Sequence, residues 1–413
     1  MRFINYRLLL SLVLGINIFT SCKKADVTPP PTGGGGGGVS VSKEDLIKDS
    51  TLLYARDIYL WYNQIPASFN PRSYADPNKI MEALRQYSTE PGFSAPVDRW
   101  SFAMKQSEWN NISSGISVDF GFSVFFLNAN DLRVKFVERA SPAGKAGIRR
   151  GWRITKINGS TNINANDQSS LDMIINAVFN STQASFTFLK PDGTSIDIPL
   201  TATTYQEQPV MLDSVYTINS KKVGYMVFNS FLVDTTQIYN EFSRVFNRFA
   251  TQNVGDVIID LRYNGGGYVS IQEKLANYLA PLSANGKLMS VQKYNDKYSQ
   301  YNVSTNFRKT GSLNLSRVFF IISSSTASAS EMLINNLTPY IEVKMIGRNS
   351  THGKPVGYFP IPVGDWYIFP VSSKNTNASG AANYYNGFAP NAVVADAVDK
   401  DWGDITEASL ASA

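Results

Sequence analysis

The chain has 413 residues, enough for two or three domains, and its 43% hydrophobic and 17% charged residues are typical of a folded globular protein. Its formal charge of +5 includes two arginines in a leader that we expect to be removed, so charge gives no reason to expect nucleic-acid binding. A single cysteine excludes an internal disulfide, and one cysteine with one histidine cannot build the usual zinc site. We therefore expect neither a metal nor a cofactor.

Residues 1–21 are typical of an export signal, because Arg2 and Arg7 precede an apolar run that is too short to span a bilayer. Small residues stand directly before Cys22, the one cysteine, and this arrangement resembles a bacterial lipobox. We predict that Cys22 is lipidated and becomes the mature N-terminus; the alternative is an ordinary signal peptide that happens to contain a cysteine. Residues 22–42 are rich in proline and glycine and would form a flexible tether.

Residues 43–110 are expected to form a mostly helical segment, because apolar residues recur there at helical spacing. A second helix is predicted over 77–87, and residues 98–102 are predicted to turn into the next unit. The aromatic stretch 59–62 fits a packed helix face, although a binding surface is the alternative.

Residues 111–204 change character and predict a β-rich domain. Short β-like runs cover 117–126, 132–137, 152–157, 184–189 and 195–200. One amphipathic helix is predicted over 169–179, with Asp167 as its N-cap. Residues 191–193 read Pro-Asp-Gly, a strong turn signal between two strands.

Two parts of this region resemble a PDZ domain. The run Asp119-Phe120-Gly121-Phe122 is similar to the loop whose amides hold a peptide's terminal carboxylate, and residues 141–159 resemble the family's SPAxxAGL…GDxIxxING sequence. The resemblance implies that the module binds an extended peptide as an added strand, with Phe120, Gly121 and Phe122 at the binding site. A small β-rich domain without a ligand is the alternative.

Residues 205–413 alternate buried strands with helices, which is the pattern of an α/β domain. The predicted strands are 223–228, 257–261, 318–322 and 343–346, and the predicted helices are 236–250, 271–279 and 329–337. Ser328 lies where the third strand turns into the third helix, among small residues that allow a sharp turn. A serine at a helix N-terminus is most often a cap, but the amides there also favour a developing oxyanion.

Three blocks in this region, residues 260–267, 326–331 and 353–357, resemble in order and spacing the signatures of the C-terminal processing (tail-specific) proteases, peptidase family S41. The resemblance implies an α/β core of the crotonase/ClpP-like type behind the PDZ-like domain. It places the family's nucleophile on Ser328 and its general base on Lys354. It places the two oxyanion amides on Gly266 and Ala329.

Several residues near these blocks depart from the family's pattern or offer alternatives. Tyr358 stands where many relatives carry a glutamine that orients the lysine, and Pro339 stands where some carry an aspartate. Tyr358 as a phenolic partner of the base is a hypothesis. His352, the one histidine, would allow a Ser-His pairing but is expected to be a loop residue near the cleft. Glu331 is expected to be a capping or structural carboxylate.

These features together predict a serine endopeptidase that hydrolyses exported proteins through a Ser-Lys dyad and an acyl-enzyme, recognising C-terminal or unstructured segments. We expect the protein to be exported and anchored to a bacterial cell-envelope membrane through its lipid alone, facing the periplasm or the surface. Its expected partner is a protein or peptide substrate and not nucleic acid; the oligomeric state stays open. The alternatives are a catalytically silent peptide-binding lipoprotein scaffold and a glycan-binding or assembly lipoprotein.

Overall fold

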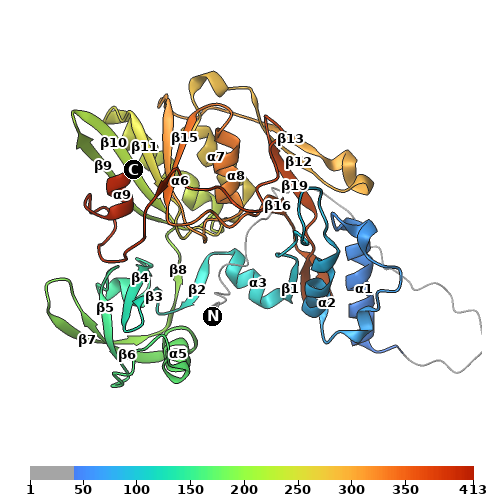
Figure 1. Ribbon diagram of the computed structural model, residues 1–413, viewed down its shortest axis with the longest axis horizontal. Coiled ribbons are helices and arrows are strands. Elements are labelled where there is room, and N and C mark those ends of the chain that lie inside the picture. Colours follow the sequence, from blue (N-terminus) through green and yellow to red (C-terminus); the bar gives the residue numbers. More distant parts are fainter. Residues whose placement is uncertain (1–40) are drawn as a thin grey trace, which may run out of the picture.

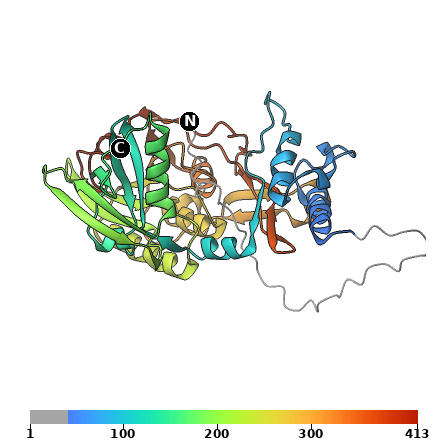
Figure 2. The same cartoon turned by 90° about the horizontal axis from the view of Figure 1, so that it is seen from below.

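The computed structural model describes residues 41–413 (Figure 1). The expected signal peptide, the lipidation site Cys22 and nearly all of the expected tether lie outside the described residues. The described part consists of an N-terminal segment, a β-rich domain and an α/β core. The N-terminal segment and the β-rich domain lie at opposite ends of the molecule, as the views in Figures 1 and 2 both show.

The helices of the N-terminal segment begin where the sequence offers a cap. Helix α1 (Lys43–Ile58) follows Ser42, whose hydroxyl accepts a hydrogen bond from the third residue of the helix. Helix α2 (Pro77–Leu84) follows Asp76, which caps it in the same way, and the turn η4 (Arg85–Tyr87) completes the predicted helix. The other elements are η2 (Tyr62–Gln64), η3 (Pro71–Ser73) and α3 (Gln106–Ser113).

The N-terminal segment also contains a strand, and this strand joins it to the far end of the chain. Strand β1 (Phe102–Lys105) pairs antiparallel with β18 (Trp366–Phe369), which pairs with β17 (Ile361–Val363). Buried aromatic and aliphatic side chains from residues 55–109 form one hydrophobic cluster with those from 356–385. The N-terminal segment therefore shares a hydrophobic core with the C-terminal part of the chain.

The β-rich domain is a five-stranded antiparallel sheet with strands in the order of the chain. Its strands are β3 (Phe122–Asn128), β4 (Asp131–Val137), β5 (Arg153–Ile157), β6 (Gln183–Leu189) and β7 (Ser195–Thr201). Its helices are α4 (Pro142–Lys145) and α5 (Gln168–Ile175), and α5 continues into the π-helical turn η5 (Asn176–Asn180). A two-stranded ribbon of β2 (Ile116–Asp119) and β8 (Thr203–Gln206) leads into and out of the domain.

Most of the elements predicted for this domain are present. Asp167 caps α5, and residues 191–193 form the turn between β6 and β7. The predicted strand over 117–126 is instead two strands. The chain turns between them at Gly121, whose φ of 77° lies in the left-handed region that favours glycine.

The core contains a six-stranded sheet in the order β20-β15-β14-β11-β10-β9, parallel except for the edge strand β9. The strands are β9 (Val210–Ile218), β10 (Lys221–Phe228), β11 (Asp256–Asp260), β14 (Arg317–Ile321), β15 (Glu342–Gly347) and β20 (Ala392–Val393). Helices α6 (Thr235–Thr251), α7 (Val269–Leu279) and α8 (Ala329–Leu337) share a hydrophobic core with one face of this sheet. The short α9 (Ala408–Ser412) contributes to a cluster on the other face.

A second sheet of the core, in the order β13-β12-β19-β16, was not predicted. Its strands are β12 (Leu288–Lys293), β13 (Val303–Asn306), β16 (Val356–Gly357) and β19 (Ser373–Asn377), with the turns η6 (Leu282–Ala284) and η7 (Asp296–Tyr301) near the first two. These strands are short and largely polar, so no apolar run marks them. The sheet matters for the site because β16 begins two residues after Lys354.

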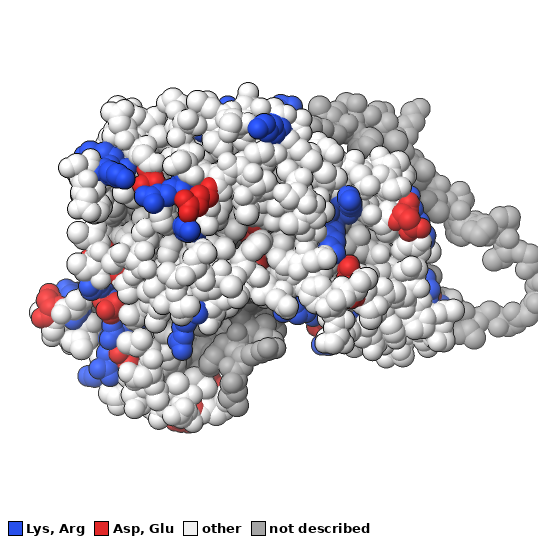
Figure 3. Space-filling view, turned by 45° about the horizontal axis from the view of Figure 1, so that its top comes forward, with Lys and Arg blue, Asp and Glu red and all other residues white. Residues whose placement is uncertain are grey.

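Charged side chains are scattered over the face in Figure 3, and the two signs are mixed there. The same view shows a notch between the β-rich domain and the N-terminal segment. Within residues 41–413, no helix has both the length and the apolar character that a bilayer span requires.

Candidate active site

Ser328 lies in a sharp turn between strand β14 and helix α8, as the sequence predicts. It is the N-cap of α8 and has φ 57° and ψ −114°, a backbone conformation that non-glycine residues rarely adopt. Such a conformation costs about 1–3 kcal/mol and persists only where the surroundings enforce it. The neighbouring Ala327 and Ala329 are buried, so small side chains pack closely around the turn. Strain at this serine is the first structural sign of a functional site.

Glu331 ties this turn to the loop that carries Lys354. Its fully buried carboxylate accepts a hydrogen bond from the Ser328 amide (2.9 Å) and, on the same oxygen, from the Lys354 amide (2.8 Å). The other oxygen accepts from the Gly353 amide and the Thr351 hydroxyl, both at 2.6 Å. Burial raises the pKa of Glu331, while these four donors favour its charged form. Glu331, which the sequence predicted to be a capping or structural carboxylate, thus links the two predicted catalytic residues. One of its oxygens accepts hydrogen bonds from the backbone amides of both Ser328 and Lys354.

Lys354 is deeply buried, with 4% of its surface exposed. Burial lowers its pKa to about 7, against the negative charges of Asp98 and Glu331, which act to raise it. A lysine in this state is largely a neutral amine at slightly alkaline pH and can accept a proton. The chemistry required of a general base is therefore available at this position.

The ring of Tyr358 faces the lysine ammonium, with Nζ 4.0 Å from the ring centroid. Tyr358 is fully buried, and its ring packs edge-on against Phe102 (5.4 Å) and Phe369 (5.6 Å). The contact between the two side chains is thus a cation–π contact, which favours the charged lysine.

The glycine-rich loop after β11 lies against the Ser328 turn through Asn264. The Asn264 carbonyl accepts hydrogen bonds from the Ala327 amide (3.1 Å) and the Ser330 hydroxyl (3.0 Å). Its side-chain oxygen accepts from the Gly266 amide (2.9 Å), so this predicted oxyanion donor is engaged within its own loop. The amide of Ala329, the first of α8, makes no hydrogen bond to any of residues 41–413. The two predicted oxyanion donors therefore differ in their hydrogen bonding. The Gly266 amide is already bonded to Asn264, whereas the Ala329 amide has no partner within residues 41–413.

Residues 98–99 of the N-terminal segment contact the loop between β15 and β16 that carries Lys354, here called the base loop. This contact was not predicted from the sequence. Arg99 donates through Nη2 to the carbonyls of His352 (3.2 Å), Gly353 (3.3 Å) and Tyr385 (2.8 Å). Gly353 has φ 87°, and a Cβ there would lie 2.1 Å from the Tyr385 oxygen, so only glycine fits this junction. The preceding Asp98 is buried and supplies part of the negative charge that acts on the lysine. The sequence signal that could have indicated this contact is the charged pair Asp98-Arg99 next to the aromatic Trp100.

His352 lies in the loop between β15 and β16, as expected. Its amide donates to the Thr326 carbonyl (2.9 Å), and its ring packs edge-on against Trp100. Burial, together with the positive charges of Arg99 and Lys354, lowers the pKa of His352 to about 4. The imidazole is therefore neutral at physiological pH.

A buried charge cluster joins the β-rich domain to the glycine-rich loop. Arg150, between α4 and β5, donates to the Tyr263 hydroxyl (2.8 Å) and to the Asp396 carboxylate (2.5 Å). Arg262, beside Tyr263 in the loop, pairs with Asp396 (3.2 Å) and Glu407 (2.9 Å). The position of the loop that carries Gly266 is thus set partly by the β-rich domain.

The predicted peptide-binding residues of the β-rich domain lie at the start of β3. The side chains of Phe120 and Phe122 point into the domain core, where both pack edge-on against Phe186. The Gly121 amide donates to the Asp119 carboxylate (2.7 Å). Any contribution of Phe120 and Phe122 to peptide binding would have to come from their backbones.

Comparison of this fold with known proteins identifies a serine peptidase. Residues 222–394 match the family model "Peptidase family S41", and residues 49–102 match "Peptidase S41 N-terminal domain". The chain belongs to peptidase family S41, which confirms the family predicted from the three sequence blocks.

Among curated proteins, the chain is similar to a "Probable CtpA-like serine protease" of Staphylococcus aureus (strain N315), with 23% identity over 317 residues. The match covers 72% of this chain and 60% of the relative, so the chain spans about three fifths of the length of the curated relatives it matches. A "Probable CtpA-like serine protease" of Staphylococcus epidermidis is 24% identical over 262 residues, covering 63% of this chain and 50% of the relative.

Two solved structures share the fold. A "Putative S41 protease from Bacteroides fragilis NCTC 9343" superposes with a TM-score of 0.72 at 24% identity, covering 88% of this chain and 95% of that one. The "Photosystem II D1 C-terminal processing protease" gives 0.52 at 16% identity, covering 86% and 94%. The expected α/β architecture, with an N-terminal helical segment and a β-rich domain, is confirmed.

Proposed function

We propose that the protein is a serine endopeptidase in which Ser328 is the nucleophile and Lys354 the general base. One observation carries the proposal: the Glu331 carboxylate holds the strained turn of Ser328 beside a buried lysine whose pKa is about 7. A serine hydroxyl needs a base to become a useful nucleophile, and a lysine can act as that base only when burial brings its pKa toward neutrality. The shared hydrogen bonds to Glu331 and the lowered pKa of Lys354 support this pairing.

The reaction proceeds in two halves. The Ser328 oxygen attacks the peptide carbonyl while Lys354 takes the hydroxyl proton, and the resulting ammonium gives that proton to the departing amine. Water then attacks the acyl-enzyme, Lys354 takes a proton from it, and the serine leaves with that proton. The Ala329 amide lies at the helix N-terminus, where it can stabilise the oxyanion. For Gly266 to contribute the second donor, its amide must leave the Asn264 side chain.

The substrates we propose are exported proteins, recognised at C-terminal or unstructured segments and delivered by the β-rich domain acting as a PDZ-like module. The strand order of that domain and its buried contact with the glycine-rich loop support this role. Lipidation at Cys22 would hold the enzyme at a cell-envelope membrane by a tether. Mass spectrometry of the membrane fraction, with Cys22→Ala as the comparison, tests the anchor.

A fluorophosphonate probe and an unfolded protein such as β-casein test the catalytic assignment. Ser328→Ala and Lys354→Ala should both lose probe labelling and casein cleavage while keeping the circular dichroism spectrum of the wild type. Lys344→Ala is a matched control, because Lys344 is exposed and pairs only with Glu342 at the surface. Cleavage that persists in Ser328→Ala would remove the proposal.

One observation favours the alternative of a silent peptide-binding scaffold, namely that the Gly266 amide is held by Asn264. In that case the wild type would bind peptides but neither react with the probe nor cleave casein. If the held amide is the cause of the silence, Asn264→Ala, which releases it, should restore probe labelling.

A further inference from the structure

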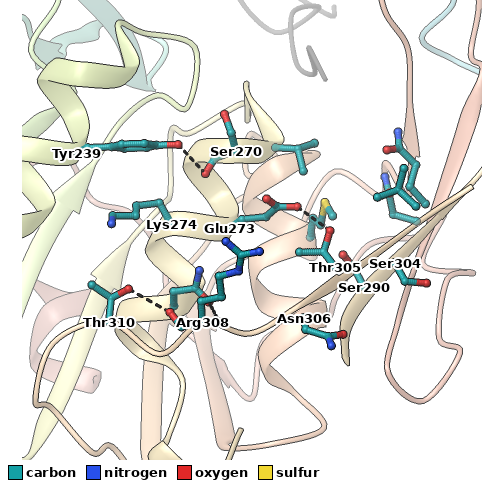
Figure 4. Close-up of a pocket in the computed structure, with 16 residues that line it drawn as sticks. Tyr239, Ser270, Glu273, Lys274, Ser290, Ser304, Thr305, Asn306, Arg308 and Thr310 are labelled. Carbon is teal, nitrogen blue, oxygen red and sulfur yellow. Dashed lines mark hydrogen bonds between the residues drawn. The ribbon is translucent and has the colours of Figure 1, made fainter. Parts of the chain in front are cut away.

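A polar groove of about 950 Å³ lies between helix α7 and the strands of the second core sheet (Figure 4). Glu273 lies near the middle of its α7 wall, and Thr305 of β13 donates a hydrogen bond to the Glu273 carboxylate (3.2 Å) from across the groove. Lys274 and Arg308 also line it. The volume is in the range of sites that bind a ligand of several residues.

The groove runs along the open edge of β13. Alternate side chains of a strand point to opposite faces of its sheet, yet all four residues 303–306 of β13 line the groove. The groove therefore contacts both the side chains on one face and the backbone of this edge strand. No strand within residues 41–413 pairs with that edge, and Val303 there is 47% exposed. An edge of this kind can pair with an extended peptide.

The sheet lining of the groove is unusually polar for a face that looks toward helices. Ser290, Gln292, Thr305 and Asn375 all contribute to it, although such a face is normally apolar. Asn375 is 4% exposed, and its Oδ1 has no hydrogen-bond partner among residues 41–413. Burying a polar atom without a partner costs free energy, so this lining favours an occupant that supplies hydrogen bonds.

Two residues that line the groove are close in sequence to the proposed catalytic centre. Val269, two residues after Gly267 of the glycine-rich loop, and Met332, one helical turn after Ser328, both line it. The Asn375 amide donates to the carbonyl of Pro355, the residue that follows Lys354 (3.1 Å). The segments that carry Gly266 and Ser328 therefore each contribute a residue to the groove lining, and the segment that carries Lys354 is hydrogen-bonded to a third lining residue.

We propose that this groove binds three or four substrate residues next to the scissile bond, as a strand added to β13, with a donor-bearing side chain such as lysine facing Glu273. This inference rests on the proposed function. The α7 wall from residue 269 to 277 is about 12 Å long at 1.5 Å per residue, which matches three to four extended residues at about 3.3 Å each. Burial raises the pKa of Glu273, while the hydrogen bond from Thr305 and the positive charge of Arg308 act to lower it.

Peptide binding to the full chain carrying Ser328→Ala tests the groove without requiring catalysis. Fluorescein-labelled eight-residue peptides with lysine or norleucine at the central positions would be titrated by anisotropy. Hydrogen–deuterium exchange would then locate the bound peptide. We expect protection of residues 303–306 and of the first turns of α7. We also expect Glu273→Gln to weaken the lysine peptide at least fivefold and the norleucine peptide less than twofold.

Glu241→Gln is the matched control, since Glu241 lies on neighbouring α6 and pairs with Arg244 at the surface. Protection elsewhere without protection of β13, or equal weakening of both peptides by Glu273→Gln, would overturn the proposal. So would the absence of any peptide binding, which would mean that the groove holds water alone. Probe labelling of Ser328 in the otherwise unchanged chain decides the proposed function separately.

Discussion

Replacing Glu331 with glutamine should uncouple the serine turn from the lysine loop. The carboxylate accepts four hydrogen bonds, and none of its oxygen atoms is solvated because the residue is fully buried. The glutamine NH₂ group can replace only the oxygen that faces Thr351 and Gly353, since the hydroxyl of Thr351 can turn and accept. The Gly353 amide is then left facing another donor.

The magnitude follows from these contacts. A buried amide left without an acceptor costs about 1–3 kcal/mol, and each remaining bond loses its charge assistance, about 1 kcal/mol apiece. Relief from burying a charge offsets part of this, so we expect the free energy of unfolding to fall by about 2–4 kcal/mol. Misplacement of Ser328 or Lys354 would raise the activation free energy. If this rise equals about half of the loss in stability, kcat/KM falls about tenfold, because 1.4 kcal/mol corresponds to a factor of ten.

The assay pairs urea unfolding with the rate of fluorophosphonate labelling, measured where the variant is fully folded by circular dichroism. Glu342→Gln is the control, because Glu342 is an exposed carboxylate paired only with Lys344. An unchanged unfolding midpoint together with an unchanged labelling rate in Glu331→Gln would refute the assignment of Glu331 as the link.

Three further outcomes are expected. With the pKa of Lys354 at about 7, the base is protonated in acid, so kcat/KM for casein should rise through about pH 7 and level off above it; a flat profile from pH 6 to 9 would contradict this. Arg99→Ala should lower kcat about 5–30-fold with KM nearly unchanged, because its Nη2 has two protons for three carbonyls and the exposed side chain contributes only about 1–2 kcal/mol. Arg72→Ala, which breaks an exposed ion pair in the same segment, should leave kcat unchanged; equal effects of the two would argue against a positioning role for Arg99. Arg150→Met should lower the free energy of unfolding by about 1–3 kcal/mol, because Asp396 loses one cation but keeps Arg262; stability equal to the wild type in urea would show that the cluster is not coupled in this way.

The sequence alone determined the central elements of the core and the order of its functional blocks. The run 257–261 predicted β11 (Asp256–Asp260), and the predicted helix over 329–337 has the same bounds as α8. The strand prediction succeeded because a strand covered on both faces must be apolar throughout, and the helix prediction because apolar residues such as Leu333 and Leu337 recur one helical turn apart. The strand-to-helix turn at Ser328 follows from the same two elements.

Tertiary structure decided the parts whose residues carry no such pattern. Strand β19 (Ser373–Asn377) contains no apolar residue, and it forms because β12 and β16 supply its hydrogen-bond partners. The contact between Arg99 and the base loop joins residues more than 250 positions apart. The pKa of Lys354 likewise depends on burial by distant segments and on the charge of Asp98. A local sequence can specify which residue is a lysine, but only the packed fold removes the water and places the charges that decide how readily it gives up its proton.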